Sequence, residues 1–244
     1  MDTSTDILET LRSGRITLKG EFLWGSNYTF LADVEYAGMA ISAVYKPSRG
    51  ERLLWDFPAA TLAHREVAAF MVSDALRWNL VPPTVFRISG PLGPGSLQYF
   101  VDHDPEYHYF NFIEEDRQRL RPVVLFDVVI NNADRKGSHI LRGSNGRLWL
   151  IDHGVCFHVE DKLRTVIWEF SGQTIPVELA NDINRFGHNL KSVKGVPTSL
   201  AKDFLNYISH AELDAMVTRI DRLVSTDRFP MPALDRRVIP WPQL

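Results

Sequence analysis

Three aspartates and a histidine fall within one short stretch, residues 127–152, which also holds a predicted β-hairpin. Asp134 follows an apolar run with helical character, His139 comes five residues later, and Asp152 closes the second strand of the hairpin. Because a hairpin folds back on itself, we expect these side chains to come together at one end of it. The set suits metal-dependent phosphate chemistry, in which one carboxylate orients or deprotonates an acceptor hydroxyl and another holds Mg²⁺ on the phosphates.

The carboxylates of this stretch are expected to have different roles. Asp152 follows four apolar residues of a strand that has little other use for an acid at its end, so it fits a Mg²⁺ ligand. The alternative is that it caps the next turn. Asp134 lies in the sequence Asn-Ala-Asp-Arg, which could also be an ordinary turn that ends a helix. Asp127, inside the apolar run, is expected to pair with Arg135 or with backbone amides.

The stretch resembles the catalytic and metal-binding loops of the phosphatidylinositol 3-/4-kinase-like branch of the protein-kinase-like fold, and within it a small bacterial group. Those loops read Asp-Arg-x-x-x-Asn and, after a strand, Asp-x-Gly, and the matches here start at Asp134 and at Asp152. The resemblance implies that Asp134 is the catalytic base or orients the acceptor, and that Asp152 binds the metal. His139 stands where the family usually has an asparagine as second metal ligand. A neutral imidazole suits Mn²⁺ or Zn²⁺ better than Mg²⁺, and the alternative is a histidine bonded to nearby backbone.

The rest of the chain supplies the elements that could position these residues. Periodicity and turn residues predict strands at 15–23, 28–36, 39–45, 84–88 and 96–101, and a long helix at 58–78 capped by Asp56. Later helices are predicted at 121–130, 177–186, 200–207 and 211–224, with the hairpin at 139–152 and a proline-rich tail at 229–244 that packs as an extended strap or frays. This order is that of an α+β, bilobal protein-kinase-like fold. Its β-rich N-lobe with one long helix would cover 1–102, and its mostly helical C-lobe with the hairpin 103–244.

A kinase-like site also needs a cation on the third strand and an acid on the following helix to orient it. Lys46 ends the third predicted strand, and Glu66 lies on the next helix beside its apolar stripe. A carboxylate in that position is costly unless it is paired, so Lys46 is its expected partner. The alternatives are a local pairing of Glu66 with Arg65 or His64, and a Lys46 that is an ordinary surface lysine.

Two further segments are candidates for binding the nucleotide. The turn Gly25, Ser26 and Asn27 could place backbone N–H groups and a hydroxyl against phosphates. It lacks the GxGxxG of protein kinases and resembles the shorter, serine-containing phosphate loop of the lipid-kinase-like branch. The fifth predicted strand would lead into the hinge that holds adenine, although aromatic residues in a strand are more often core. The hinge candidates are Phe100, Val101 and Asp102.

Composition narrows the class of protein. The 244 residues are 45% hydrophobic and include six Trp, which favours a folded globular chain. The net charge of −3 gives no general attraction to nucleic acids. Cys156 is the single cysteine, so no intrachain disulfide can form. The first ten residues are not a signal peptide, and the best apolar run, 123–130, is too short to span a bilayer. We therefore expect a soluble cytoplasmic protein.

Together these residues predict a phosphotransferase that uses ATP and Mg²⁺ or Mn²⁺ to transfer the γ-phosphate to a hydroxyl acceptor. Protein, small-molecule and lipid acceptors all stay open, because the resemblance concerns only the phosphate machinery. A second hypothesis is a nucleotide-binding pseudokinase scaffold, which the histidine at 139 and the minimal glycine turn at 25–27 motivate. A third is a metallohydrolase, with ligands drawn from Asp134, His139, Asp152, His153 and His158. That third reading gives the predicted Lys46–Glu66 pair no role.

Overall fold

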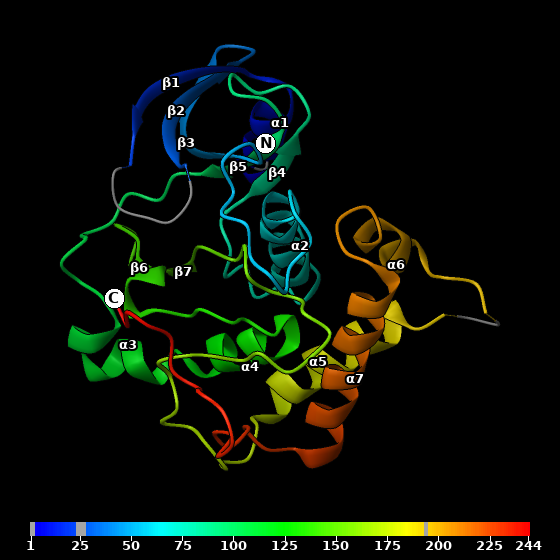
Figure 1. Cartoon of the computed structure of the whole chain (residues 1–244). Coiled ribbons are helices and arrows are strands. Elements are labelled where there is room, and N and C mark those ends of the chain that lie inside the picture. The colour runs from blue at the N-terminus through cyan, green and yellow to red at the C-terminus, as the bar shows by residue number, and fades with distance from the viewer. Residues whose placement is uncertain (1–2, 23–27, 193–194) are drawn as a thin grey trace.

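The computed structural model describes residues 3–22, 28–192 and 195–244. A curved β-sheet and two helices, α1 and α2, form the upper part of the molecule in Figure 1, and a group of helices forms the lower part. The phosphate-loop candidates Gly25, Ser26 and Asn27 lie outside the described residues.

The upper sheet has five antiparallel strands in the order β1-β2-β3-β5-β4. The strands are β1 (Arg15–Glu21), β2 (Phe30–Tyr36), β3 (Met39–Pro47), β4 (Thr84–Arg87) and β5 (Gly95–Tyr99). All five were predicted, with ends that differ by a few residues. The register places Lys46 of β3 opposite Ser96 of β5, so the lysine lies beside the strand that leads out of the sheet toward residue 100.

Helix α1 (Thr3–Ser13) was not predicted from the sequence. Its Leu11 is fully buried in a small core with Val34, Tyr45 and Leu97 of the sheet. Few apolar residues line this helix, so the sheet on which it packs accounts for its stability more than its own sequence pattern does.

Helix α2 (Leu62–Ala75) begins four residues later than predicted: residues 58–61 are not helical. The predicted cap, Asp56, is wrong: its carboxylate lies 3.3 Å from the ammonium of Lys162. The carboxylate of Glu51 accepts hydrogen bonds from the first two backbone N–H groups of the helix, at 3.1 and 2.9 Å. A carboxylate from another segment thus satisfies the exposed donors at the helix start.

The lower part is built around a large apolar core that also takes in one face of α2. Its helices are α3 (Glu114–Gln118), α4 (Arg121–Ile130), α5 (Val177–Leu190), α6 (Ser199–Phe204) and α7 (His210–Thr226), and the short 3₁₀ turns are η1 (Tyr109–Asn111) and η2 (Gly137–His139). The hairpin pairs β6 (Ile140–Arg142) with β7 (Leu148–Leu150). Helix α4 has the predicted bounds: proline is tolerated in its first turn, and Asn131 ends it in a left-handed conformation.

The tail packs as an extended strap, residues 228–244, one of the two outcomes expected for it. It runs from the lower end of α7 across the lower lobe toward β6 (Figure 1, orange to red). The backbone carbonyl of Val238 accepts from the N–H of Thr165 at 3.0 Å, and that of Gln243 accepts from the N–H of Gly137 at 2.8 Å. The strap therefore holds the segment between Asp134 and the hairpin.

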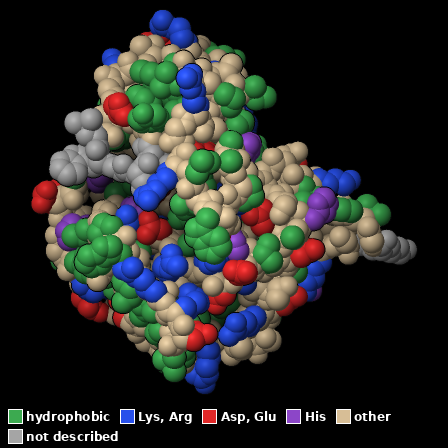
Figure 2. All heavy atoms as spheres, viewed as in Figure 1, with side chains coloured by type: hydrophobic (Ala, Val, Ile, Leu, Met, Phe, Trp, Pro, Cys, Tyr) green, Lys and Arg blue, Asp and Glu red, His purple; other side chains and the backbone are tan. Residues whose placement is uncertain are grey.

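Charged side chains of both signs are interspersed over the lower half of the face shown in Figure 2. The net charge of −3 is therefore not gathered into one acidic field on this face. No helix in the described part of the chain is long and apolar enough to cross a membrane.

Candidate active site

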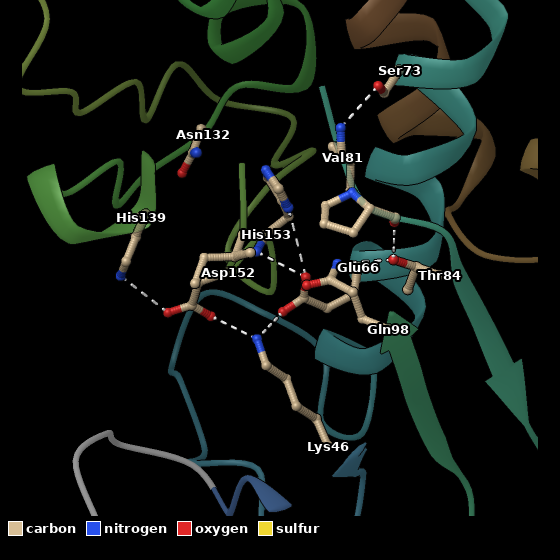
Figure 3. Close-up of polar contacts among 12 residues, drawn as sticks. Lys46, Glu66, Ser73, Val81, Thr84, Gln98, Asn132, His139, Asp152 and His153 are labelled. Atoms are coloured by element: carbon tan, nitrogen blue, oxygen red, sulfur yellow. Dashed lines mark hydrogen bonds and ion pairs between the residues drawn. The ribbon is translucent and has the colours of Figure 1, made fainter. Parts of the chain in front are cut away.

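Lys46, Glu66 and Asp152 meet where the sheet, α2 and the end of β7 come together (Figure 3). The Lys46 ammonium lies 2.5 Å from Glu66 Oε1 and 3.1 Å from Asp152 Oδ1. The predicted Lys46–Glu66 pair is therefore present. Glu66 is buried, whereas the Asp152 side chain is about half exposed, so the cluster is closed on the α2 side and open at the aspartate.

The charges of this cluster stabilise one another. Burial alone would raise the pKa of Glu66, but the Lys46 ammonium and a hydrogen bond with His153 lower it to about 2. Burial likewise acts against the ammonium of Lys46, yet Asp152 and Glu66 raise its pKa well above the usual value. The lysine in turn holds the pKa of the Asp152 carboxyl well below its usual range. All three groups are therefore charged at neutral pH.

Asp152 also faces His139, whose Nε2 lies 3.3 Å from the second carboxylate oxygen. Burial lowers the pKa of His139 to about 4, so the imidazole is neutral near pH 7. Nδ1 accepts from the backbone N–H of Lys136 at 3.5 Å, the backbone contact expected as the alternative, so the ring proton is on Nε2 and a metal bound there would take its place. The backbone of Asp152 has φ of 61°, a left-handed conformation that costs energy for a non-glycine residue and often marks a functional position.

This pair of side chains fits a divalent cation that takes its other ligands from a phosphate or from water. Carboxylate oxygen and neutral imidazole nitrogen are both suitable donors. Within residues 3–22, 28–192 and 195–244, no group of three or more His, Cys, Asp or Glu side chains could hold a metal. Of the metallohydrolase candidates, His153 is enclosed by Arg135 and Glu66, and His158 packs edge-on against Phe57.

Asp134 lies on the loop between α4 and η2, with its side chain about one-third exposed. Its backbone N–H donates to Asn132 Oδ1 at 2.9 Å, which fixes the turn. Burial raises the pKa of Asp134 to about 6; Lys136, with its ammonium 3.5 Å away, opposes this rise, and the charge of Asp152 adds to it. A carboxylate with such a pKa is ionised at pH 7 and is a stronger base than an ordinary aspartate.

Arg135 is the centre of a buried framework beneath this loop. It is fully buried and contacts Asp127 with both Nε and Nη2, at 3.0 to 3.2 Å. The predicted Asp127–Arg135 pair is therefore confirmed. Nη1 donates to the carbonyls of His139 and Ile151, so one guanidinium joins α4, the loop, η2 and the end of β7.

His153 is a member of this framework that sequence reasoning did not assign to it. Arg135 Nη2 lies 2.8 Å from His153 Nε2 and, having only protons to give, donates to it. The proton of the neutral ring is then on Nδ1, which faces Glu66 Oε2 at 3.7 Å, while the backbone N–H of His153 donates to the same oxygen at 3.0 Å. His153 thus connects the framework to the Lys46 cluster, and its position directly after Asp152 was the available signal.

A cavity of about 370 Å³ opens beside the cluster between the upper sheet and the hairpin. Of the hinge candidates, Phe100 and Val101 line it, whereas Asp102 does not, and the carbonyl of Asp102 accepts a hydrogen bond from the Ser144 N–H. Gln98, which the sequence reasoning passed over, is buried in its wall and donates to Thr84 Oγ1 at 2.8 Å. The alternation of β5 was the signal for it, since residues 98 and 100 share one face.

Comparison with solved structures gives the class of fold. Solved structures with similar folds include the Golgi casein kinase with Mn/ADP bound (TM-score 0.55, 15% identity, 91% of this chain and 74% of that one) and hydra Fam20 with sugar (TM-score 0.58, 15% identity, 93% and 89%). The Helicobacter pylori proinflammatory kinase CtkA is also similar (TM-score 0.52, 12% identity, 89% and 96%). The fold is therefore the predicted α+β, bilobal protein-kinase-like fold.

The sequence comparison gives the family. A model of the family described as phosphatidylinositol 3- and 4-kinase matches residues 38–218. Protein Rv2133c of Mycobacterium tuberculosis is 38% identical to this chain, in an alignment that covers 95% of this chain and 93% of that protein. The chain belongs to the phosphatidylinositol 3- and 4-kinase family, as the resemblance of its loops indicated.

Proposed function

We propose that the chain is a phosphotransferase that moves the γ-phosphate of ATP to a hydroxyl acceptor with the help of Mg²⁺ or Mn²⁺. The observation that carries the proposal is the ammonium of Lys46, held between Glu66 and Asp152 at the wall of a cavity. A fixed cation beside an open carboxylate is what the phosphates of a metal-bound nucleotide require.

Each group of the cluster has a distinct role in this proposal. Lys46 binds the nucleotide phosphates, and Glu66 keeps its ammonium in place. Asp152 and His139 would hold the divalent cation, which supplies positive charge to phosphate oxygens. Because burial keeps His139 neutral, it can donate its lone pair throughout the neutral pH range.

Asp134 is proposed to accept the proton of the acceptor hydroxyl or to orient that hydroxyl. Its raised pKa of about 6 supports this, because a general base works best when its pKa approaches the working pH. Its exposure allows an acceptor to reach it.

The cavity beside the cluster is proposed to hold the adenosine. Its size falls within the range of small-ligand sites, and Phe100, Val101, Leu141 and Ile151 give it apolar walls. Gln98 offers an amide on the inner wall. The turn at 25–27 completes the proposal as the phosphate loop, and Asp102 as the outer end of the hinge.

The experiment is a nucleotide titration of the full chain, with thermal unfolding and ADP formation followed in parallel. ATP with Mg²⁺ or Mn²⁺ at about a hundredfold over its Kd should add roughly 2.7 kcal/mol, or about 5–10 °C in Tm. Lys46→Met should abolish the shift. Lys19→Met removes a lysine of β1 that pairs with Asp33 of β2, and it should leave the Tm shift intact. The absence of a shift with any adenine or guanine nucleotide at millimolar concentration would contradict the proposal.

A nucleotide-binding scaffold is the second candidate, and the histidine at 139 in place of the family's asparagine favours it. The same titration separates the two, since a scaffold binds ATP without forming ADP or a phosphorylated product with any acceptor. The acceptor itself, whether protein, small molecule or lipid, would be sought by transfer of labelled phosphate.

The lobes are proposed to divide at residue 102, with 1–102 above and 103–244 below the cavity. A cytoplasmic location is proposed from composition, because the one cysteine, Cys156, is buried and cannot form an intrachain disulfide.

A further inference from the structure

A second cavity lies in the lower lobe, between α7, residues 159–172 and the first half of the strap. Its volume is about 920 Å³, which is within the range of sites for small organic ligands. It shares no lining residue with the cavity beside Lys46. We call it the strap groove.

The strap groove has an apolar floor. Val128 of α4, Leu163 and Trp168 line it, together with Phe229 of the strap, which is buried. Its rim adds apolar side chains that are open to solvent: Val159 is 52% exposed and Met231 68%. Removing such surface from water is favourable, so a ligand with an apolar body would be stabilised here.

The walls of the groove are rich in positive charge. Four arginines and two aspartates line it: Arg219, Arg222, Arg228, Arg236, Asp161 and Asp214. Two of the arginines bond to other residues that line the groove. Arg236 forms an ion pair with Asp161 at 2.7 Å, and Arg228 donates to the carbonyl of Gly172 at 2.8 Å. Asp214 partly offsets the remaining charge, which still leaves an excess of positive charge.

Arg219 and Arg222, one turn apart on α7, carry the charge that the protein leaves unsatisfied. Arg219 donates to the carbonyls of Val129 and His158, but its Nη2 is buried and bonds to no atom of the described residues. Burial lowers its pKa to about 10, so the guanidinium remains charged at neutral pH. A cation that is largely removed from water without an ion-pair partner is costly. Arg222 is exposed, and its side chain has no hydrogen bond or ion pair within the described part of the chain.

We propose that the strap groove binds a small amphiphilic anion, with its phosphate or carboxylate head at Arg219 and Arg222 and its apolar body on the floor formed by Leu163, Trp168 and Phe229. The head supplies the negative charge that these arginines lack, and the body covers the exposed apolar rim. The site is separate from the Lys46 cavity and does not depend on the function proposed for it.

The probe is decyl phosphate, titrated calorimetrically into the full chain below its micelle-forming concentration. We expect saturable binding to one site, at least about tenfold tighter than inorganic phosphate or decanol, because each of these supplies only half of the interaction. Decanoate should also bind, and its Kd relative to decyl phosphate tells which head the site prefers. No saturable binding of either amphiphile at 1 mM, or equal binding of inorganic phosphate and decyl phosphate, would overturn the proposal.

Two substitutions test the residues, each with a matched control in the upper lobe. Arg222→Glu should weaken decyl phosphate by at least about tenfold, the weight of one charge-assisted contact, whereas Arg12→Glu, on the exposed side of α1, should not. Met231→Glu should weaken it as well, whereas Ile88→Glu, at a still more exposed apolar position, should not. All four positions are exposed, so folding should be preserved. Equal affinities for a variant and its control would overturn the assignment.

Discussion

Two groups of ion pairs are joined through His153, and they differ in how many of their hydrogen bonds the protein itself supplies. Arg135 and Asp127 are fully buried, and all three guanidinium nitrogens of the arginine are used by protein atoms. In the Lys46 cluster, by contrast, Asp152 is half exposed and borders a cavity. The same residue types are thus structural where the protein completes their bonds, and available to a ligand where it does not.

The largest effect is expected from breaking the buried pair of Arg135 and Asp127. Arg135→Met should lower the free energy of unfolding by about 3–5 kcal/mol, because it leaves the buried carboxylate of Asp127 without its charged partner. Urea unfolding measures this. Arg15→Met, which breaks the exposed pair with Glu35, should cost under about 1 kcal/mol. Similar losses in the two variants would show that burial does not decide how much an ion pair contributes to the stability of this protein.

At the partly exposed Asp134, the substitution Asp134→Asn should lower phosphoryl transfer by about 10²–10⁴-fold, the usual weight of a positioned acid or base. Nucleotide affinity should stay nearly unchanged, since the Lys46 cluster is left intact. ATP affinity and turnover are measured in parallel. If binding and turnover vanished together in a folded variant, Asp134 would belong with the nucleotide site rather than with the acceptor.

Asp152→Ala should remove the roughly 2.7 kcal/mol that metal-bound ATP adds at about a hundredfold over its Kd. The unliganded chain should keep almost all of its stability, because the side chain is half exposed and Lys46 retains Glu66. Thermal unfolding with and without metal-ATP gives both numbers. The control, Asp33→Ala, breaks a comparable pair with Lys19 on the sheet and should leave the ATP shift unchanged.

Asp134 should also make the chain less stable at neutral than at acidic pH. Its pKa is about 6 in the folded state and 3.8 is the ordinary value, so the folded state binds the proton more tightly. The stability that this gives is present below pH 4 and is lost as pH rises toward 6. Asp134→Asn should therefore be more stable than wild type by about 1–2 kcal/mol at pH 7.5, allowing for partial exposure. At pH 4 the two proteins should unfold at similar urea concentrations; a constant difference would exclude this origin.

The smallest effect is expected at His139. His139→Asn restores the residue usual in the family, so it should keep activity and narrow any preference for Mn²⁺ over Mg²⁺ only severalfold. Binding of ATP is titrated with each metal for the two proteins. An unchanged ratio of the two affinities would make His139 a structural residue.

The parts that could be predicted are those that local pattern determines. Helix α4 has a proline in its first turn and an asparagine at its end, and its bounds were predicted correctly. The pairing of Lys46 with Glu66 could be predicted because Lys46 ends the third predicted strand and Glu66 lies beside the apolar stripe of the next helix. A carboxylate in such a position needs a partner.

The parts that were missed depend on distant residues. Helix α1 relies on the sheet for its burial, and the cap of α2 comes from Glu51 rather than from Asp56, the acid nearer in sequence. The role of His153 is set by Arg135 and Glu66, which approach it only in the folded chain. Gln98 was overlooked since its importance comes from the cavity that other segments enclose.

The hydrogen bond from Gly137 to the strap makes the folding of the loop after Asp134 depend on the timing of synthesis. Gln243, which accepts that bond, is made roughly a hundred residues after Gly137. At about 5–20 residues per second, the ribosome takes on the order of 5–20 s to cover that interval. Throughout it, the backbone N–H of Gly137 lacks the acceptor that it has in the folded protein. A nascent chain can therefore form its sheet and its hairpin before the loop beside Asp134 gains its hydrogen bond to the strap.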